Sequence, residues 1–388
     1  MAAALMDELM EAILLRISSD DLAGLVRAAL VCKRWCRIIS NPGFRHRFRE
    51  LHPRPAMLGF LRNQGTVSSF VPTSSFRPPR CDGTAKFKTL IKCYTHATRR
   101  NFPTIDARHG RVLLHSVSWK LGENPLKNPF VVWDPIAGER RELPLLPWSS
   151  NPYSWNAAVL CASTGACNHL DCRHGPFLVV LVGTDQEGMF ACVYSSEAAA
   201  WSERTSAHYP GHEIILMPSA LVGNALYFMF WYSESILKYD LGTHEMTVIP
   251  VPVECSFRRV VLMTRDDGEL GLAYMENLRL YLWSMVECPD DEENVEWAER
   301  KVIELRTLLP DEALSADSLD VAGFADGASV IFVRTDGGLF TIDLESYRVT
   351  RVCGEGWYYG NFPYVGFCTP ALEAASTIVG PATGTSNI

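Results

Sequence analysis

The feature that most constrains this chain is a strand pattern that repeats over most of its length. From about residue 57, short β-branched and aromatic runs alternate with Gly, Pro, Asn and Asp turns, which is typical of an all-β sandwich, barrel or propeller. Five units share one order of strands, and their second strands carry the landmarks Trp133, Tyr194, Tyr239, Trp283 and Ile342. The landmarks lie 61, 45, 44 and 59 residues apart. Propeller repeats run roughly 40–50 residues, so the pattern predicts an all-β, propeller-like domain of about five to six blades in which two units carry insertions.

Strands left over at both ends of this region are expected to close the ring. They fall at residues 57–71, 86–106 and 363–368 and would complete another blade. Ring closure removes exposed strand edges, which otherwise invite aggregation. We therefore place the β domain at residues 57–372. Residues 373–388 are small and polar, a composition that predicts a disordered tail.

The start of the chain has a different, all-α pattern. Apolar residues recur at helical spacing over residues 9–17 and again over residues 22–40, and Asn41-Pro42 has the pattern of an N-cap and a first helical residue. We place this small domain at residues 1–52. A helical domain of this size does not bury so much apolar surface alone. Either another protein chain or the β domain should cover the rest, and the pattern leaves both alternatives open.

Four short motifs follow one another in this helical segment: Leu5-Met6-Asp7-Glu8-Leu9, Ala12-Ile13-Leu14-Leu15-Arg16-Ile17-Ser18, Val31-Cys32-Lys33-Arg34-Trp35 and Ile39-Ser40-Asn41-Pro42-Gly43-Phe44. In this order they resemble an F-box, with Met6 and Ser18 where the family usually has proline. The resemblance implies binding to an Skp-type adaptor and, through it, to a cullin. By position, either the Skp contact or the local core would be formed by Leu9, Ile13, Leu14, Ile17, Leu22, Leu25, Val31, Trp35 and Ile38.

The β region carries a second ordered set of landmarks: Met57–Phe60, Phe70–Thr73, Arg108–Arg111 and Phe362–Pro370. In this order it resembles the F-box-associated, kelch-like propeller domains of plant proteins, particularly those of grasses. The resemblance implies a non-catalytic substrate-recognition subunit of an SCF-type (Skp–cullin–F-box) ubiquitin ligase, with a protein target bound by the propeller. Two other functions stay open: a propeller-type binding scaffold without ligase coupling, and a propeller hydrolase.

A cluster of metal-ligand residues interrupts the second unit, at Cys161, Cys167, His169, Cys172 and His174. Structural zinc favours Cys and His ligands in a tetrahedron, so these five are candidate zinc ligands. Their spacing differs from the paired C-x₂₋₄-C of common zinc motifs, and Cys172 and His174 are close together for two ligands. The alternative is an inter-blade loop with reduced thiols.

Charge and missing motifs narrow the function further. The net charge is −8 and the acidic excess lies beyond residue 60, which argues against nucleic acid as a partner. No apolar run reaches the roughly 18 residues of a membrane helix, and the N-terminus lacks the basic region of a signal peptide. We expect an intracellular protein, in the cytoplasm or nucleus, without a membrane partner or a cofactor. The sequence shows no phosphate-binding glycine loop, nucleophile elbow or His-Glu-x-x-His motif.

Loops of the β region carry further candidates for contact with a target. Aromatic side chains are favoured anchors when a rigid scaffold presents them on loops, although packing within blades is the alternative for each. The acidic run at residues 287–296 is expected to be a solvated loop. The aromatic candidates near predicted loops are Trp148, Tyr153, Trp155, Trp231, Tyr232, Trp357, Tyr358 and Tyr359.

Overall fold

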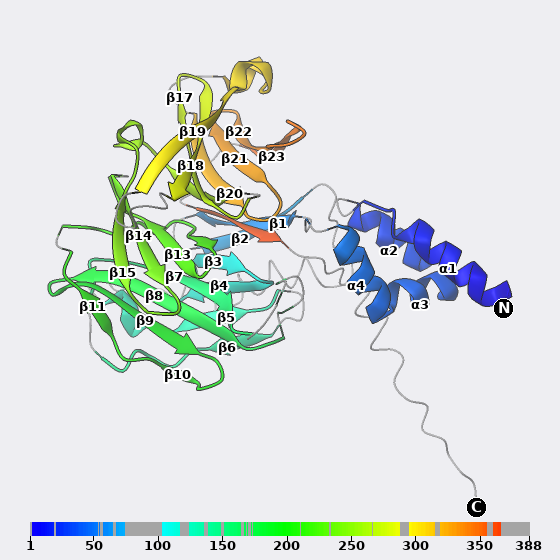
Figure 1. Cartoon of the computed structure of the whole chain (residues 1–388), viewed down its shortest axis with the longest axis horizontal. Helices are drawn as coiled ribbons and strands as arrows, with labels where there is room; N and C mark the ends of the chain where they lie inside the picture. Colours follow the sequence, from blue (N-terminus) through cyan, green and yellow to red (C-terminus); the bar gives the residue numbers. More distant parts are fainter. Residues whose placement is uncertain are drawn as a thin grey trace, which may run out of the picture.

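A computed structural model gives an N-terminal group of helices followed by a ring of sheets (Figure 1). No helix in the described ranges is long and apolar enough to span a membrane. The predicted tail and the aromatic residues 357–359 lie outside those ranges. The structure describes residues 2–18, 21–52, 54, 57–64, 67–73, 103–116, 124–135, 139–148, 151–163, 167, 169, 172, 174–209, 211–232, 234–265, 267–287, 295–314, 319–354 and 360–365.

The helical region contains α1 (Ala2–Leu14), α2 (Leu22–Val31), α3 (Lys33–Ser40) and α4 (Pro42–Leu51). The apolar stretch 22–40 is therefore two helices, because Cys32 is extended, with φ −160° and ψ 162°. Asn41 caps α4 as the sequence predicts: its Oδ1 accepts a hydrogen bond from the Gly43 N–H at 2.7 Å, and Pro42 follows in the first turn.

The described part of the β region forms six antiparallel sheets, five of them built from consecutive strands. The first blade contains β3 (Thr104–Arg108), β4 (Arg111–His115), β5 (Phe130–Trp133) and β6 (Arg140–Glu142), and the second contains β7 (Ser154–Cys161), β8 (Phe177–Asp185), β9 (Gly188–Ser195), β10 (Ala200–Trp201) and β11 (Thr205–Ala207). The third contains β12 (Ala220–Val222), β13 (Ala225–Met229), β14 (Ser235–Asp240) and β15 (Met246–Pro250). The fourth contains β16 (Val261–Thr264), β17 (Leu270–Glu276), β18 (Arg279–Glu287) and β19 (Val295–Glu304), and the fifth contains β20 (Asp320–Ala325), β21 (Val330–Thr335), β22 (Gly338–Asp343) and β23 (Val349–Cys353).

The sequence landmarks occupy equivalent places in these five blades. Each lies in the third strand of its blade and not in the second strand, which the pattern predicted: Trp133 in β5, Tyr194 in β9, Tyr239 in β14, Trp283 in β18 and Ile342 in β22. All but Trp283 are buried, and each landmark packs in a hydrophobic cluster shared with the preceding blade. The prediction of a propeller with five to six blades is confirmed, and the number of sheets is six.

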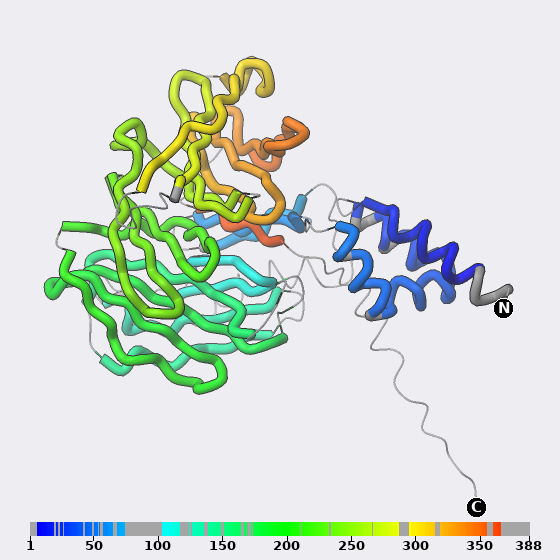
Figure 2. Tube along the Cα trace, viewed as in Figure 1, coloured from blue at the N-terminus to red at the C-terminus, as the bar shows by residue number. Residues whose placement is uncertain are grey.

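The sixth sheet closes the ring with strands from both ends of the β region. β1 (Met57–Gln64) lies between β2 (Val67–Pro72) and β24 (Asn361–Val365), and Figure 2 shows these early and late segments side by side. The predicted closing strands at 57–71 and 363–368 are found here as far as they are described. The predicted closing strand at 86–106 is described only from residue 103 onward. Its residues 104–106 belong to the first blade, because this strand pairs with β4.

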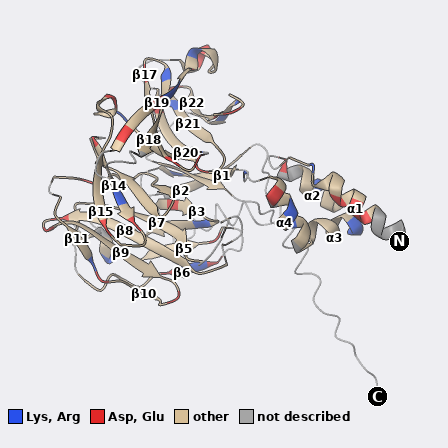
Figure 3. Ribbon diagram, viewed as in Figure 1, with Lys and Arg blue, Asp and Glu red and all other residues tan. Residues whose placement is uncertain are grey.

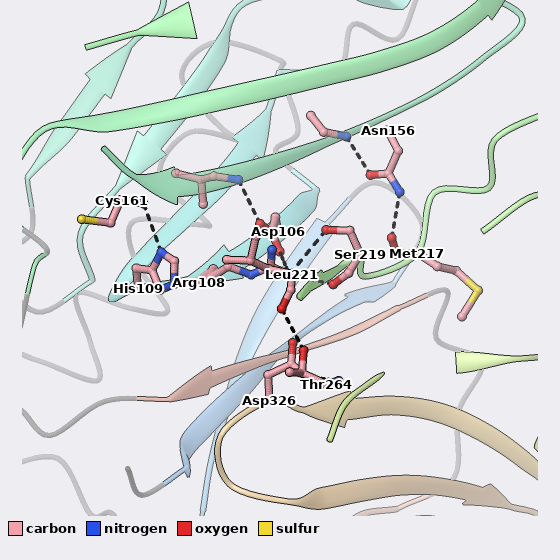
Figure 4. Close-up of polar contacts among 12 residues, drawn as sticks. Asp106, Arg108, His109, Asn156, Cys161, Met217, Ser219, Leu221, Thr264 and Asp326 are labelled. Atoms are coloured by element: carbon pink, nitrogen blue, oxygen red, sulfur yellow. Dashed lines mark hydrogen bonds and ion pairs between the residues drawn. The ribbon is translucent and has the colours of Figure 1, made fainter. Parts of the chain in front are cut away.

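Hydrogen bonds from side chains to backbone groups join neighbouring blades around the inner strands (Figure 4). Each inner strand has no ladder partner on its central side, so these bonds satisfy polar groups that would otherwise be buried unpaired. They also link each blade to the next. Around the ring the pairs are Asp106 with Val159 N–H, Asn156 with Met217 C=O, Thr264 with Leu221 C=O, Asp326 with Thr264 N–H, Asn361 with Ala322 C=O and Asn63 with Thr104 C=O.

The propeller has two faces with different neighbours. Met57 of β1 pairs with Val365 of β24, so the chain enters from the helices at the end where the inner strand β24 finishes. The turn after the inner strand β3 lies there too, because Tyr364 Oη donates to Gly110 O at 3.1 Å. We call this end, with the loops that follow inner strands, the helix-side face. Loops that precede inner strands, and loops between second and third strands, form the far face.

The helices and the propeller share one hydrophobic cluster. It contains Leu14, Leu25 and Phe48 from the helices together with Leu58 of β1 and Tyr364 of β24. The β domain therefore packs against part of the helical region, as one of the two alternatives predicts, and Figure 1 shows the helices extending away from the propeller. Much apolar surface on the helices nevertheless remains exposed.

Candidate functional site

Helix α1 has two faces of different character. Asp7, Glu11 and Leu14 fall on one face; Arg34 Nε of α3 lies 2.5 Å from Asp7 Oδ1, and Arg47 Nη2 of α4 lies 2.5 Å from Glu11 Oε1. Figure 3 shows charges of both signs over these helices. Because each helical residue turns the chain by about 100°, Met6, Leu9 and Ile13 fall on the opposite face.

Among the residues that the structure describes, that opposite face is an apolar stripe without a packing partner. Met6, Leu9 and Ile13 are 57%, 61% and 57% exposed, and their i, i+3, i+7 spacing aligns them along the helix. Leu30 and Val31 at the end of α2 are also exposed. A surface helix ordinarily turns its apolar stripe inward, so a stripe facing solvent is a candidate surface for another chain.

The structure divides the nine predicted F-box residues between surface and core. Leu14 and Leu25 are buried, and Ile17, Trp35 and Ile38 pack partly buried against the same cluster. Leu9, Ile13 and Val31 are exposed, while the side chain of Leu22 lies outside the described part of the chain. Sequence reasoning missed Met6 and Leu30, although Met6 precedes Leu9 at helical spacing.

A second group of exposed apolar side chains lies on the far face of the propeller. Trp231 and Tyr232 follow the second strand of the third blade, and Val253 and Phe257 precede the inner strand of the fourth. The rings of Tyr232 and Phe257 pack edge to face at 6.0 Å, and the Phe257 N–H donates to Tyr232 O at 3.0 Å. Val253 and Phe257 are 78% and 77% exposed. Among the other predicted aromatics, Tyr153 is exposed, whereas Trp148 and Trp155 are partly buried in blade packing.

Ligand-type side chains gather on the helix-side face, at the end of β7. Sulfur and nitrogen atoms of Cys161, Cys167, His169 and Cys172 all lie within 4.8 Å of one another. His174 is not a member of this group. Burial, a hydrogen bond with Cys161 and nearby thiols raise the pKa of the Cys172 thiol to about 12. Burial opposes ionisation of Cys161 too, but hydrogen bonds from Ser163 and the neighbouring thiols outweigh it and lower that pKa.

Carboxylates at the centre of the ring serve blade junctions. Desolvation raises the pKa of both Asp106 and Asp326, and Arg108 opposes the rise. Asp106 Oδ2 accepts from the Val159 N–H at 2.9 Å, and Asp326 Oδ1 accepts from the Thr264 N–H at 3.1 Å (Figure 4). Arg108 donates across the ring to Ser219 O at 2.6 Å. These contacts give each acid a structural partner.

Two family models match the chain. The model described as "F-box protein AT5G49610-like, beta-propeller" matches residues 104–365. The chain belongs to this family. The model described as "F-box-like" matches residues 7–50, the segment that carries the exposed stripe. Both resemblances drawn from the sequence, to an F-box and to an F-box-associated propeller, are therefore confirmed. No curated protein matches the chain.

Solved structures similar to this F-box propeller protein are distant. A nidogen/laminin complex has 11% identity and a TM-score of 0.44, covering 80% of this chain and 99% of that one. The WD40 domain of SCAP from fission yeast has 14% identity and a TM-score of 0.37, covering 66% and 59%. A structure of YjhT has 11% identity and a TM-score of 0.37, covering 67% and 86%.

Proposed function

We propose that this chain is the substrate-recognition subunit of an SCF-type ubiquitin ligase. The F-box would bind an Skp-type adaptor, and through it a cullin, while the propeller holds a protein target. Holding the target raises its local concentration near the ubiquitin-charged enzyme, so catalysis belongs to other subunits. The ligase would work in the cytoplasm or the nucleus.

The exposed stripe on α1 carries this proposal. Met6, Leu9 and Ile13 present a row of apolar side chains on a helix of an F-box-like segment, which is the form that helix-in-groove partners recognise. The same helix is held on its other face by ion pairs to α3 and α4. The stripe is thus presented by a braced element, which lowers the ordering cost of binding.

Apolar side chains on the far face support a target site there. Trp231, Tyr232, Val253 and Phe257 are exposed, and binding energy concentrates on such large anchors when a partner buries them. Exposed acids lie beside them in the chain, at Glu234 and Glu254. We infer a protein target that offers an apolar pocket with a basic rim. A target on this face leaves the helix side of the propeller clear for the ligase.

Matched surface variants test the two halves of the proposal separately. Leu9→Asp places a charge on the stripe, and Val253→Asp places one on the far face; both residues are exposed, so both variants should fold. Co-precipitation with a purified Skp-type adaptor should fall at least tenfold for Leu9→Asp and stay unchanged for Val253→Asp. Proximity labelling in cells should show the converse loss of target proteins for Val253→Asp. Unchanged adaptor binding by Leu9→Asp would overturn the adaptor half.

A scaffold without ligase coupling is the second candidate. Met6 stands where the family usually has proline, and α1 runs without interruption from Ala2 through this position. A scaffold of this kind would bind the Skp adaptor yet give no cullin-dependent ubiquitination of the bound target. Reconstitution with adaptor, cullin and charged enzyme separates the two candidates, because only the ligase subunit produces ubiquitinated target.

A further inference from the structure

Four side chains of the second blade converge on one point. Cys161 is the last residue of β7, and Cys167, His169 and Cys172 follow in the loop that leads to β8. Their ligand atoms all lie within 4.8 Å of one another. We propose that these four residues form a structural zinc site. The site goes beyond the proposed ligase role and does not depend on it.

Distances within the group fit ligands around a tetrahedral ion. Zinc bonds thiolate sulfur at about 2.3 Å and imidazole nitrogen at about 2.0–2.1 Å, which places two such sulfurs about 3.8 Å apart and a sulfur and a nitrogen about 3.6 Å apart. Cys161 Sγ and Cys167 Sγ are 3.9 Å apart, and Cys172 Sγ and His169 Nδ1 are 3.8 Å apart. A disulfide needs about 2.05 Å between sulfurs, and these three cysteines are free.

Neighbouring groups hold two of the ligands in place. The Ser163 N–H points to Cys161 Sγ at 3.4 Å, and the Ser163 hydroxyl lies 3.2 Å from the same sulfur. His109, in the turn after β3, accepts the Cys161 N–H at its Nδ1 at 3.0 Å. The His109 ring also stacks on His169, with 4.2 Å between centroids and 19° between planes. Outer-shell contacts of this kind orient metal ligands.

Arg111 holds the backbone of the loop at Cys172 and Gly175. Its Nη2 donates to Cys172 O and to Gly175 O, each at 2.7 Å, and the residue is only 2% exposed. A zinc ion with three thiolates and one neutral imidazole carries a net charge of −1. The buried guanidinium of Arg111 is therefore a suitable counter-charge as well as a brace from the first blade.

The donor set identifies both the ion and its role. Three thiolates and one imidazole suit zinc and disfavour Mg²⁺ and Ca²⁺, which take oxygen ligands. Four protein ligands fill a tetrahedron and leave no open position for a reacting water, so the site is structural. Binding exchanges the thiol protons for the ion and releases them to solvent. The ion would brace the segment that joins β7 to β8 on the helix-side face.

Metal content of the full-length chain tests the proposal, with two histidines as a matched pair. Protein purified under reducing conditions without added metal should hold about one zinc ion per chain by elemental mass spectrometry. His169→Ala should lower the zinc content and weaken zinc binding at least tenfold in competition with a chelator. His174→Ala, five positions along the same loop, should leave both unchanged. Circular dichroism checks that both variants fold.

Cobalt substitution provides a readout that folding alone does not change. Wild-type protein loaded with Co²⁺ should show thiolate-to-cobalt charge transfer and the strong d–d bands of a tetrahedral ion, and Cys167→Ser should weaken the charge transfer. The zinc assignment is overturned if the reduced chain neither retains nor binds zinc, if it holds copper or iron instead, or if His174→Ala loses the ion and His169→Ala keeps it. Peptide mapping that finds Cys161 bonded to Cys167 in the purified chain would also overturn it.

Discussion

At the scale of single residues, the inner-strand carboxylates combine a structural hydrogen bond with an electrostatic cost. Asp106 is buried and bonds the Val159 N–H, and desolvation raises its pKa although Arg108 opposes the rise. An acid whose folded pKa lies above its unfolded pKa binds its proton more tightly in the folded state. Its ionisation therefore costs stability above the folded pKa, and the cost disappears as pH falls toward the unfolded pKa.

Comparing wild type with Asp106→Asn should reveal the stability that ionisation of Asp106 costs. The variant keeps an acceptor oxygen but does not titrate, so wild type should gain melting temperature relative to it as pH falls from about 7.5 to about 4.5. Asp267→Asn is the control of opposite sign. A hydrogen bond from Arg265 holds the pKa of Asp267 below its usual value, so wild type should keep its advantage over that variant down to the ordinary aspartate pKa and lose it as pH falls below about 4. Thermal unfolding at fixed pH values measures both, and equal trends in the two variants would contradict the assignment.

His109 is a positioning residue for the proposed zinc site, and its substitution has a well-matched control. Its φ is +53°, a left-handed conformation that asparagine tolerates. His109→Asn removes both the stacking on His169 and the acceptor placed at the Cys161 N–H, so zinc affinity should fall by about 10–100-fold. His244 also has a positive φ, +61°, and lies in the third blade. Chelator competition should show no change for His244→Asn, and an equal loss in both variants would contradict the role of His109.

At the scale of elements, shortening a side chain of α1 should have different effects on its two faces. On the buried face it should lower the stability of the protein, and on the exposed face it should weaken adaptor binding. Leu14 is 1% exposed, whereas Leu9 is 61% exposed. Leu14→Ala should destabilise the protein by about 2–5 kcal/mol, because a buried leucine is replaced by a cavity. Leu9→Ala should change the unfolding free energy by less than about 0.5 kcal/mol while weakening adaptor binding. Chemical denaturation and adaptor titration of both variants measure the contrast; a large loss of stability in Leu9→Ala would place that residue in the core.

Elements were predictable from the sequence where apolar pattern and burial agree. The third strands carry aromatic or β-branched landmarks, all of them buried except Trp283, and the sequence pattern identified these residues. β19 (Val295–Glu304) was missed because most of its residues are charged or exposed, and a sequence of this kind predicts a loop. The break between α2 and α3 was also missed, because apolar spacing continues through Cys32. At Cys32 the backbone leaves the helical conformation, although the apolar residues keep their helical spacing.

The candidate sites divide in the same way. Spacing identified the apolar residues of α1 but could not separate Leu9 from Leu14, because the partners of the face that carries Leu14 come from α3 and α4, which are distant in sequence. It also gave five metal-ligand candidates. Choosing Cys172 over His174 required the path of the loop, which Arg111 and His109 set from the preceding blade. The local sequence pattern therefore does not predict the contacts between blades, and these contacts decide which candidate residues form the site.

At the scale of the whole molecule, one late strand links ring closure to the helical region. β24 pairs with β1, and its Asn361 bonds Ala322 of the fifth blade. Phe362 and Tyr364 of the same strand belong to the hydrophobic cluster that contains Leu14 and Leu25 of the helices. Loss of β24 would therefore open the propeller edge and remove its part of the hydrophobic cluster shared with the helices.

A pair of truncations tests this coupling. Ending the chain after residue 359 removes β24, exposes the edge of β1 and leaves part of the shared cluster open, so the protein should aggregate or melt well below the full-length chain. Ending it after residue 372 keeps β24 whole and should preserve the melting temperature. Limited proteolysis locates the effect: in the shorter chain both the propeller edge and the helical region should be cleaved faster. Faster cleavage in the propeller alone would mean that the helical region is stable without the strand, and that the shared cluster contributes little to holding it.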